Sequence, residues 1–567
     1  MAPLTPPARL VSAPDPLDAP NTTYLWAQLF VEELVRTGVT LFFVAPGSRS
    51  TPLTVAAARH PEAEVVLHVD ERGTSFAALG AARATGGPAA WITTSGTAVA
   101  NGHPAVVEAD VDGVPMLLLT ADRPPELRAT GANQTVDQVK LFGDHVRDFV
   151  DVPPPSADVD PAYVLTTVDQ AVHRARRAPP GPVHLNCGFR KPLEPTQGPL
   201  PSVPDPVADW AAADTPYTRY PTPVLQPSGA DVEALAATVG AAARGVVVAG
   251  RLDRAADVQA ARRLARALNW PLLPDLTSRL RFGARADVDV PFADLVLTAD
   301  AFRAAAAPDA VLQVGGRFAS KRLRLFLRDH APAPRAVIRP SPGRVDPDHR
   351  VTHHVEAHLA PVVESLLART DAAGPDAWRE RWTAASRRAK TVVERHADTT
   401  PLTEPAVAHH LSRLVPPEHA VVAASSMPVR DLNRHAGTEG PATLLIGDLA
   451  LWHDLNSLAL VAEQPVVVIV INNDGGGIFH FLPIREHDDV FEPYFTTPQG
   501  RSFEGAAATF GLSYHSPTTP DAFRSAYETA CTGAGAALIE VQTDRAENRR
   551  VHEALEAAVA AAVTDGL

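Results

Sequence analysis

Two stretches of this chain decide its fold: ATLLIGD, residues 442–448, and PVVVIVINN, residues 465–473. Each is a short apolar run that ends in polar residues, a pattern that predicts a buried β-strand. The polar ends, Gly447-Asp448 and Asn472-Asn473, are separated by 23 residues. Because neighbouring parallel strands end at the same edge of a sheet, we expect an acidic oxygen and an amide oxygen to lie side by side there.

This arrangement predicts a site for magnesium and a diphosphate. Mg²⁺ prefers oxygen ligands and often shares them with phosphates. We expect Asp448, the Asn473 side chain and a backbone carbonyl near Gly475 to hold the ion, with Mn²⁺ as a substitute. Gly475 and Gly476 would let the backbone approach the phosphate closely. The alternative is that Asp and Asn are ordinary turn residues at these strand ends.

The length and composition indicate a globular protein with several domains. A chain of 567 residues is too long for one core and suggests about three domains. The net charge of -14 argues against a nucleic-acid partner. No apolar run is long enough to cross a bilayer, and Cys187 and Cys531 are too few for a disulfide framework. We therefore expect a cytoplasmic protein without stable membrane insertion.

The pattern of helix-like and strand-like segments predicts an α/β fold with three doubly wound parallel-sheet domains. A proline-rich stretch marks the clearest linker. The expected divisions are a disordered tail at 1–21, a first α/β domain at 22–195, the linker at 196–229, a central α/β domain at 230–370, a helical linker at 371–400 and a third α/β domain at 401–567.

The first domain carries candidate chemistry at its strand ends. In the run DERG, Glu71 lies between an apolar strand and a helix, where it is either a catalytic carboxyl or a charge partner for the helix N-terminus. The run TTSGTAVANG, residues 93–102, contains small residues that let a flat ring approach the backbone. Two further runs follow, TADRPP at 120–125 and GANQT at 131–135.

With these motifs the chain resembles the thiamine diphosphate enzymes of the decarboxylase type. The resemblance rests on Glu71, the Ser95-Gly96-Thr97 turn, and the Gly447-Asp448 and Asn472-Asn473 pairs. It implies that the three domains are the pyrimidine-binding, central and diphosphate-binding domains. It also implies thiamine diphosphate as the cofactor, which adds to a 2-oxo acid through its C2 ylid and holds the carbanion left by loss of CO₂.

The resemblance assigns roles to individual residues. Glu71 would be the catalytic residue, hydrogen-bonded to the aminopyrimidine, a role that suits a carboxyl with a raised pKa. Ile478 would pack against the cofactor, although it could equally be an ordinary core residue. The remaining cofactor-binding residues would be Ser95, Gly96, Thr97, Gln134, Gly447, Asp448, Asn473, Gly475 and Gly476.

Motifs such as APGSRS, residues 45–50, and ADRPPEL, residues 121–127, are similar to one member of the family in particular. That member is a transferase of menaquinone biosynthesis, which decarboxylates 2-oxoglutarate and adds the four-carbon fragment to isochorismate. Both substrates are dicarboxylates, and arginine binds a carboxylate through two parallel hydrogen bonds. The matching positions are Ser48, Arg49, Arg123, Gln134, Lys321, Arg322, Ser426 and Arg430.

Each cation in that set could instead be a solvated surface charge. Arg49 and Arg123 are the stronger candidates because glycine and proline fix their loops. Lys321 and Arg322 are the weakest, because residues 321–328 form a basic amphipathic run that could be an exposed helix face.

The chain departs from the family between Arg430 and Gly447. Only 16 residues separate them, whereas the family has a strand, an Asn-Arg-Gly segment ending in Gly-Ile-Asp-Gly, and a helix. About thirty residues are absent by usual element lengths. Loss of a central strand normally leaves unpaired backbone groups. Either the region is rebuilt, or the sequence lacks a piece, or activity is lost.

Three functional hypotheses follow. The first is the active synthase, which the resemblance implies is a homodimer or homotetramer because the family binds its cofactor between subunits. The second is another thiamine diphosphate-dependent lyase or synthase. The third is a catalytically inactive homologue that acts as a structural or binding subunit.

Overall fold

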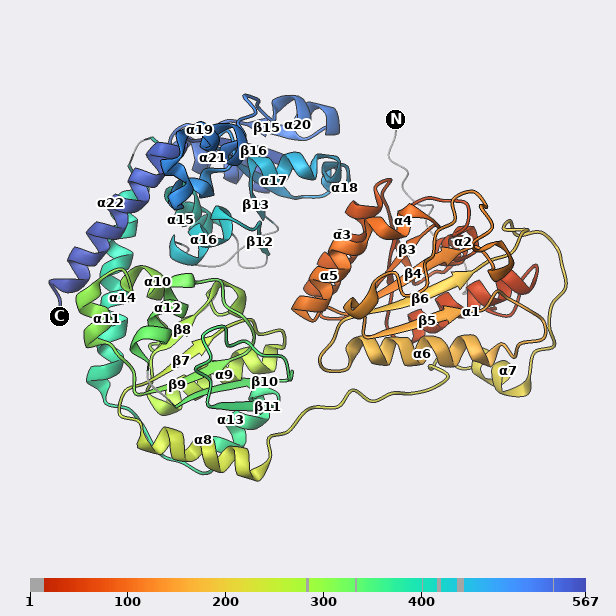
Figure 1. The fold of residues 1–567 in the computed structure, drawn as a ribbon, viewed down its shortest axis with the longest axis horizontal. Coiled ribbons are helices and arrows are strands. Elements are labelled where there is room, and N and C mark those ends of the chain that lie inside the picture. The colour runs from red at the N-terminus through yellow and green to blue at the C-terminus, as the bar shows by residue number, and fades with distance from the viewer. Residues whose placement is uncertain are drawn as a thin grey trace. The chain divides into compact units, whose positions relative to one another are not determined.

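The computed structural model of this protein describes residues 15–281, 285–331, 334–399, 401–415, 420–435, 443–533 and 535–567. The chain divides into two compact units, Met1–Pro223 and Val224–Leu567. Within the described residues, the first unit holds a six-stranded parallel sheet and the second holds two five-stranded parallel sheets (Figure 1). The predicted class, α/β with three parallel-sheet domains, is confirmed.

The sheet of the first unit has the strand order β2-β1-β3-β4-β6-β5. Its strands are β1 (Leu41–Val44), β2 (Glu64–Leu67), β3 (Ala89–Thr93), β4 (Met116–Asp122), β5 (Asp148–Val152) and β6 (Pro182–Gly188). Its helices are α1 (Thr22–Arg36), α2 (Thr51–Arg59), α3 (Glu71–Thr85), α4 (Thr97–Asn101), α5 (His103–Asp112), α6 (Ala162–Arg176) and α7 (Asp205–Ala211).

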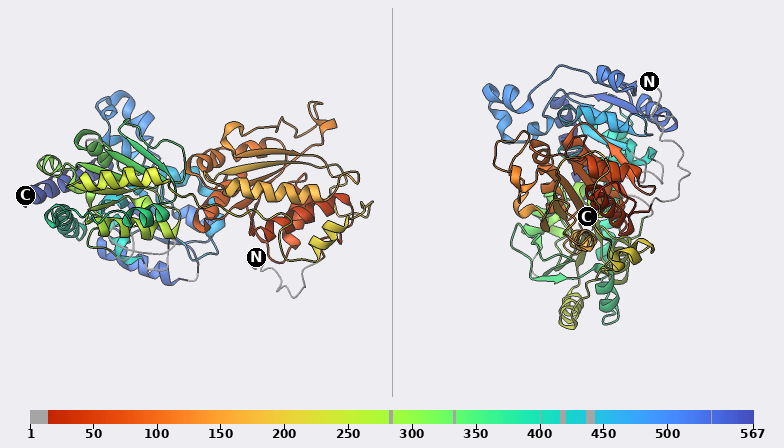
Figure 2. Two further views of the ribbon diagram at one scale, coloured as in Figure 1. Left: turned by 90° about the horizontal axis from the view of Figure 1, so that it is seen from below. Right: turned by 90° about the vertical axis from the view of Figure 1, so that its right-hand side faces the viewer.

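Helices cover both faces of this sheet, as the side view in Figure 2 shows. Along β4, Leu117 and Leu119 join the core formed with α1, α2 and α6, whereas Leu118 joins the core formed with α3 and α5. Alternate side chains of one strand thus enter two different cores, which is why the strand is apolar throughout.

The central sheet has the order β11-β10-β9-β7-β8. Its strands are β7 (Gly245–Ala249), β8 (Leu272–Pro274), β9 (Ala310–Val314), β10 (Arg335–Arg339) and β11 (His353–Glu356). Its helices are α8 (Gly229–Ala241), α9 (Ala255–Leu268), α10 (Ala293–Val296), α11 (Asp300–Ala305), α12 (Lys321–His330), α13 (Leu359–Leu367) and α14 (Asp376–Ala397).

The C-terminal sheet has the order β12-β13-β14-β16-β15. Its strands are β12 (Val421–Ala423), β13 (Thr443–Gly447), β14 (Val467–Asn472), β15 (Ser513–His515) and β16 (Ala537–Gln542). Its helices are α15 (Glu404–Leu414), α16 (Met427–His435), α17 (Asp448–His453), α18 (Leu458–Val461), α19 (Asp488–Phe491), α20 (Glu504–Phe510), α21 (Pro520–Thr532) and α22 (Arg545–Thr564).

The last helix, α22, leaves the C-terminal sheet and packs on the central one. Its Leu555, Val559 and Val563 are buried in the same core as Trp378 and Trp382 of α14. Figure 1 shows the two helices side by side. This packing joins the two sheets of the second unit through a shared apolar core.

The shortened segment before Gly447 leaves β12 and β13 in direct contact. These strands pair in parallel, with Val421 opposite Thr443 and Ala423 opposite Leu445. Residues 436–442, which fall in the segment, lie outside the described residues. The hydrogen-bonded ladder from β12 to β15 is therefore continuous, and the unpaired strand edges that the shortening led us to consider do not occur between β12 and β13.

The stretch predicted as the linker at 196–229 contains α7, and α8 begins at its last residue. Val207 and Trp210 of α7 are buried in the core of the first unit. The Trp210 indole donates a hydrogen bond to Glu33, 2.7 Å from Nε1 to Oε2. The tail at 1–21 lies mostly outside the described residues, and the domain boundaries given above stay predictions. Among the described helices, none is long and apolar enough to span a membrane.

Candidate active site

The carboxylate of Asp448 lies at the edge of the C-terminal sheet where β13 and β14 end. Gly447 is paired with Ile471 in the parallel register, so both strands end at the same level. Asp448 is the first residue of α17 and is buried. Its Oδ2 accepts a hydrogen bond from the Gly475 backbone N–H at 2.7 Å, and its Oδ1 accepts one from Leu449 at 2.7 Å. The two strand ends are therefore side by side, as predicted.

The Asn473 side chain, just past the end of β14, has an amide oxygen without a hydrogen-bond partner among the described residues. Its Nδ2 donates to Glu404 Oε1 at 3.0 Å, whereas its buried Oδ1 has no hydrogen-bond partner among the described residues. A buried acceptor without a partner is costly. A carboxylate and an unpaired amide oxygen are the hard ligands that Mg²⁺ takes. The residues present thus fit a magnesium ion.

Burial raises the pKa of Asp448, and the neighbouring Asp474 carboxylate adds to the effect. A protonated carboxyl is a poor metal ligand. A bound cation would reverse this shift because its charge favours the ionised form. Binding of a cation would therefore be coupled to ionisation of Asp448.

The glycines after Asn473 form a loop with no room for side chains. Gly475 has φ +132°, and a Cβ there would overlap the carbonyl oxygen of Thr496. At Gly476 a Cβ would lie 2.5 Å from the carbonyl oxygen of Phe495. Ile478 follows in a short 3-10 helix, Gly477–Phe481, and is half-buried. Only glycine permits this loop at Gly475.

Glu71 is the first residue of α3, directly after the strand-to-helix junction that the sequence predicts. Its side chain is partly exposed, and Oε2 accepts a hydrogen bond from Asn101 Nδ2 at 3.1 Å. The helix is capped by Asp70, whose side chain accepts from the Arg72 N–H. Glu71 is therefore not needed as the cap, which leaves its carboxylate available for another role.

The structure brings four of the predicted residues of the first unit together at the ends of β3 and β4. The guanidinium of Arg123 donates to Ser95 Oγ and, at 2.8 Å, to the Asn133 carbonyl. Ser95 Oγ donates to the Gln134 carbonyl at 3.1 Å, and Gln134 Nε2 donates to the Ser95 carbonyl at 3.0 Å. Gly96 packs on Gln134, where a Cβ would lie 3.0 Å from its Cγ. Thr97 starts α4 with an exposed side chain.

Arg49 lies buried beside this group. Its Nη1 donates to the Phe189 carbonyl at 2.7 Å, while its Nε has no hydrogen-bond partner in the described part of the chain. Burial lowers the pKa of Arg49, and the charge of Arg123 lowers it further. Two close guanidinium groups favour an anion between them. Ser48, which precedes Arg49, is exposed.

The four remaining predicted residues lie in the second unit. Arg322 forms ion pairs with two carboxylates, Asp294 at 2.7 Å and Glu556 at 2.9 Å. Lys321 beside it is exposed. Ser426 has φ +76° in the turn before α16, and its carbonyl accepts from Arg430 one turn later. Neither pair is in contact with Asp448 or Asn473 through any hydrogen bond or ion pair of the described residues.

Sequence reasoning missed two buried residues that position the site. Glu404 holds Asn473 and also accepts from Thr543 Oγ1 at 3.0 Å. Gln138 accepts from the Gly96 N–H at 2.9 Å and donates to the Ala121 carbonyl at 3.2 Å, so it fixes the Ser95 turn. Neither belongs to a recognisable motif, and only their distant partners reveal them.

Family models and known relatives agree on what this chain is similar to. Three models match: the N-terminal thiamine pyrophosphate-binding domain at residues 26–141, the middle domain of thiamine pyrophosphate enzymes at 202–422, and the C-terminal thiamine pyrophosphate-binding domain at 421–541. Together they cover most of the chain, and each contains one of the three parallel sheets or most of it.

Curated relatives are similar over nearly the whole length. The 2-succinyl-5-enolpyruvyl-6-hydroxy-3-cyclohexene-1-carboxylate synthase of Salinibacter ruber is 63% identical, over 97% of this chain and 99% of the relative. Proteins of the same name are 53% identical in Rubrobacter xylanophilus, over 94% of this chain and 98% of the relative, and 40% identical in Chlorobium phaeobacteroides, over 94% and 96%. The alignment with the Salinibacter protein spans 585 positions, more than the 567 residues of this chain, so that relative carries residues without a counterpart here.

Matches of this extent decide the family. The chain belongs to the thiamine pyrophosphate enzymes, within the family of the 2-succinyl-5-enolpyruvyl-6-hydroxy-3-cyclohexene-1-carboxylate synthases.

Proposed function

We propose that this chain catalyses the reaction of its named relatives, in which 2-oxoglutarate is decarboxylated and its four-carbon fragment is added to isochorismate with release of CO₂. One observation carries the proposal, the 63% identity to the Salinibacter ruber synthase over 97% of this chain and 99% of that protein. The product in that name bears a succinyl group on a cyclohexene carboxylate, which agrees with a four-carbon donor and a cyclic acceptor.

Thiamine diphosphate supplies the carbanion chemistry when it is bound. The residues of this chain would hold it and exclude water. Asp448, the Asn473 amide oxygen and the Gly475 carbonyl would hold Mg²⁺ or Mn²⁺, supported by the unpartnered Asn473 oxygen. The other cofactor contacts would come from Ser95, Gly96, Thr97, Gln134, Gly447, Gly476 and Ile478.

Glu71 would serve as the catalytic carboxyl by exchanging a proton with the aminopyrimidine of the cofactor. Its position at the start of α3 and its hydrogen bond from Asn101 support this role, because the bond holds the carboxylate in one orientation. General acid or base catalysis needs such a fixed group within hydrogen-bond reach of the proton.

The dicarboxylate substrates would be held by the group of Arg49, Arg123 and Gln134, with Ser48 beside it. The Arg49 Nε that lacks a hydrogen-bond partner within the described ranges supports this assignment. Ser426 and Arg430 would bind substrate from the C-terminal domain. The assignment of Lys321 and Arg322 has less support, because Arg322 already pairs with Asp294 and Glu556.

The active form would be a homodimer or homotetramer, because family members bind the cofactor between the pyrimidine domain of one subunit and the diphosphate domain of another. Glu71 belongs to the first unit and Asp448 to the second, which is compatible with this arrangement. Light scattering under assay conditions tests it, and a monomer that turns over substrate would contradict it.

The experiment that tests the function follows isochorismate consumption by ultraviolet absorbance. Purified full-length protein is assayed with 2-oxoglutarate, thiamine diphosphate and Mg²⁺, and each is omitted in turn. Consumption that requires all three is expected. If a folded sample consumes no isochorismate but retains thiamine diphosphate, the chain is an inactive homologue. If it decarboxylates 2-oxoglutarate without using isochorismate, the chain is another enzyme of the family.

A further inference from the structure

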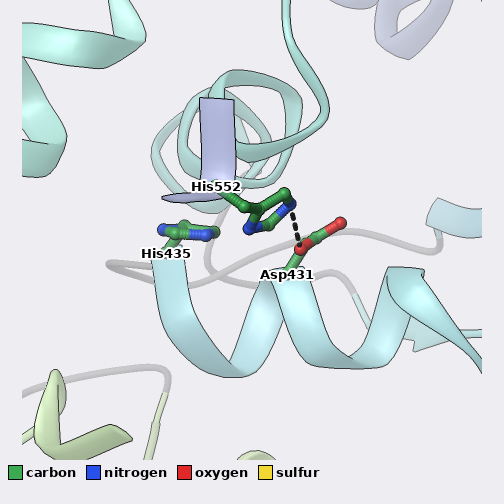
Figure 3. A group of neighbouring side chains, drawn as sticks. All are labelled: Asp431, His435 and His552. Carbon is green, nitrogen blue, oxygen red and sulfur yellow. Dashed lines mark ion pairs between the residues drawn. The ribbon is translucent and has the colours of Figure 1, made fainter. Parts of the chain in front are cut away.

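Three side chains with metal-binding atoms meet in the interior of the second unit. Asp431 and His435 are four residues apart on α16 and therefore share one face of that helix, and His552 reaches them from α22 (Figure 3). All three are buried, with exposed fractions of 3%, 0% and 2%. Their candidate ligand atoms all lie within 4.8 Å of one another.

The polar atoms of this cluster are almost entirely without partners. Asp431 Oδ1 and both ring nitrogens of His435 and of His552 have no hydrogen-bond partner in the part of the chain that the structure describes. The one polar contact within the cluster is an ion-pair distance of 3.3 Å between His552 Nε2 and Asp431 Oδ1. Burying several such groups without hydrogen bonds is costly, and native proteins rarely leave them so.

The rings are available as neutral ligands. Burial lowers the pKa of His552 to about 3 and holds that of His435 well below its usual range, with the charge of Arg434 adding to both effects. A neutral imidazole has one nitrogen with a free lone pair, and here either nitrogen of each ring can supply it. Burial also raises the pKa of Asp431, with the nearby Glu404 carboxylate contributing.

Two arginines near the cluster are already paired with carboxylates, so their charges are partly balanced. Arg434 is held by Asp294 at 3.3 Å and Glu556 at 3.6 Å, and Arg322 is held by the same two carboxylates. Glu404 faces Asp431 without a countercharge among its side-chain hydrogen-bond partners in the described residues, which are Asn473, Thr543 and Asn548. Arg322, His396, His409 and Arg430 also act electrostatically on members of the cluster.

We propose that Asp431, His435 and His552 bind a divalent transition-metal ion of the zinc class, which joins α16 to α22. Two imidazoles and a carboxylate are a ligand set that zinc accepts, with water in the fourth position. Magnesium is disfavoured here because it prefers oxygen ligands. The site is thus distinct in chemistry from the one at Asp448, and it does not depend on the proposed reaction.

One pair of ligand atoms already has the separation that a bound zinc ion requires. Ligands ~2.1 Å from a tetrahedral zinc ion lie ~3.4 Å apart. The pair of His552 Nε2 and Asp431 Oδ1 already lies at 3.3 Å. The rings of His435 and His552 are 5.6 Å apart between centroids, and the three candidate ligand atoms lie within 4.8 Å of one another, so they would have to move closer together to bind one ion.

Such an ion would stabilise the part of the chain that is shortened. His435 is the last described residue before the segment at 436–442, and α22 is anchored in the core of the central sheet. A metal bond between them would fix the end of α16 in addition to the packing of its buried residues Leu432 and His435. Metal binding of this kind contributes directly to folding free energy.

Cobalt uptake by the full-length protein tests the site. The protein is stripped with a chelator, Mg²⁺ is restored in excess, and Co²⁺ is added while visible absorbance is recorded. We expect tetrahedral Co²⁺ absorption that saturates at about one ion per chain and is displaced by Zn²⁺. Zn²⁺ should also raise the thermal unfolding temperature of the stripped protein.

Variants separate this site from adventitious binding. His552→Gln and Asp431→Asn should lose the Co²⁺ absorption and the stabilisation by Zn²⁺, whereas His349→Gln, which changes an exposed histidine of the central domain, should keep both. A folded wild-type sample that takes up no Co²⁺ overturns the proposal, and that result needs no variant to fold. Unchanged Co²⁺ absorption in folded His552→Gln also overturns it. Isochorismate consumption is not a readout, so failure of the proposed function is recognised separately.

Discussion

The side-chain amide of Asn473 donates to the buried carboxylate of Glu404, 3.0 Å from Nδ2 to Oε1, and its own oxygen has no hydrogen-bond partner among the described residues. Glu404 is itself fixed by Thr543 at 3.0 Å. Because an amide that donates through nitrogen presents its oxygen on the other side, the bond to Glu404 leaves the Asn473 oxygen available for the proposed magnesium ion. Glu404 is thus a positioning residue for the proposed magnesium site.

Glu404→Leu should weaken the activation of the enzyme by Mg²⁺. The variant removes the acceptor that orients Asn473, and loss of such a supporting contact typically costs ~10–100-fold in metal affinity. The apparent Mg²⁺ constant for isochorismate consumption measures the effect. Glu404→Gln should restore most of the affinity, since its amide oxygen can accept the same bond. Equal Mg²⁺ constants in Glu404→Leu and wild type would show that Asn473 needs no such support.

Glu71→Gln should abolish most of the turnover while leaving the fold intact. If Glu71 exchanges a proton with the cofactor, its amide replacement should lower kcat by ~10²–10⁴-fold. Steady-state isochorismate consumption at saturating substrates provides the measurement. Glu108→Gln, an exposed position on α5 in the same unit, is the matched control and should keep wild-type kcat. Wild-type turnover in Glu71→Gln would show that Glu71 serves only the helix terminus.

The stability of the first unit should fall as the pH rises toward 9. Burial, together with the neighbouring Asp169 carboxyl, raises the pKa of Glu33 to about 9. The folded state therefore binds more protons than the unfolded state above the ordinary pKa of a glutamate. By linkage, the stabilisation is complete below that ordinary pKa and is lost as the pH rises through the folded value. Between pH ~6 and ~9 the free energy of unfolding should fall by about 1 kcal/mol or more.

Urea unfolding of wild type and Glu33→Gln at both pH values tests this prediction. Glutamine keeps an oxygen that can accept from Trp210 Nε1 or from the Tyr217 N–H, the two groups that donate to Glu33 at 2.7 and 2.6 Å, but it cannot ionise. The variant should therefore lose less stability than wild type between pH ~6 and ~9. The same loss in both proteins would assign the pH dependence to other groups.

Local sequence patterns predicted the elements well wherever a periodic run had clear ends. The strand β3 (Ala89–Thr93) and the helices α9 (Ala255–Leu268) and α15 (Glu404–Leu414) are formed by runs whose apolar pattern is visible in the sequence. The helix α7 was missed because it lies in a proline-rich stretch, and the burial of its Trp210 against the first unit gives it stability that local pattern does not reveal.

Within the candidate site, only the residues that belong to sequence motifs could be predicted. The ends of β13 and β14 lie side by side, as the strand-end argument predicted, because parallel register aligns them, and Asp448 accepts a hydrogen bond from Gly475 in the following loop. The supporting Glu404 lies 69 positions from Asn473 in the chain, so no local pattern connects them. In the same way, the pairing of Arg322 with Glu556 depends on where α22 packs, which periodicity does not determine.

Two glycines of the candidate site should respond very differently to alanine. Gly475 has φ +132°, and a Cβ there would overlap the carbonyl oxygen of Thr496 and lie 2.8 Å from Arg545 Nη1. At Gly447, with φ -82°, a Cβ would meet no heavy atom within 4 Å. Gly475→Ala should therefore cost roughly 1–3 kcal/mol in the free energy of unfolding, whereas Gly447→Ala should change it by less than ~1 kcal/mol.

Urea unfolding measured without cofactor separates this backbone effect from ligand binding. Added thiamine diphosphate and Mg²⁺ should then stabilise wild type but not Gly475→Ala, because ligand that binds only the folded state raises its stability by mass action. In the variant, the strained loop is expected to shift the backbone N–H at position 475 away from Asp448, which it contacts at 2.7 Å in the wild type. If Gly475→Ala unfolds like Gly447→Ala and is stabilised by cofactor like wild type, the close approach of this loop to Thr496 is not required for the site.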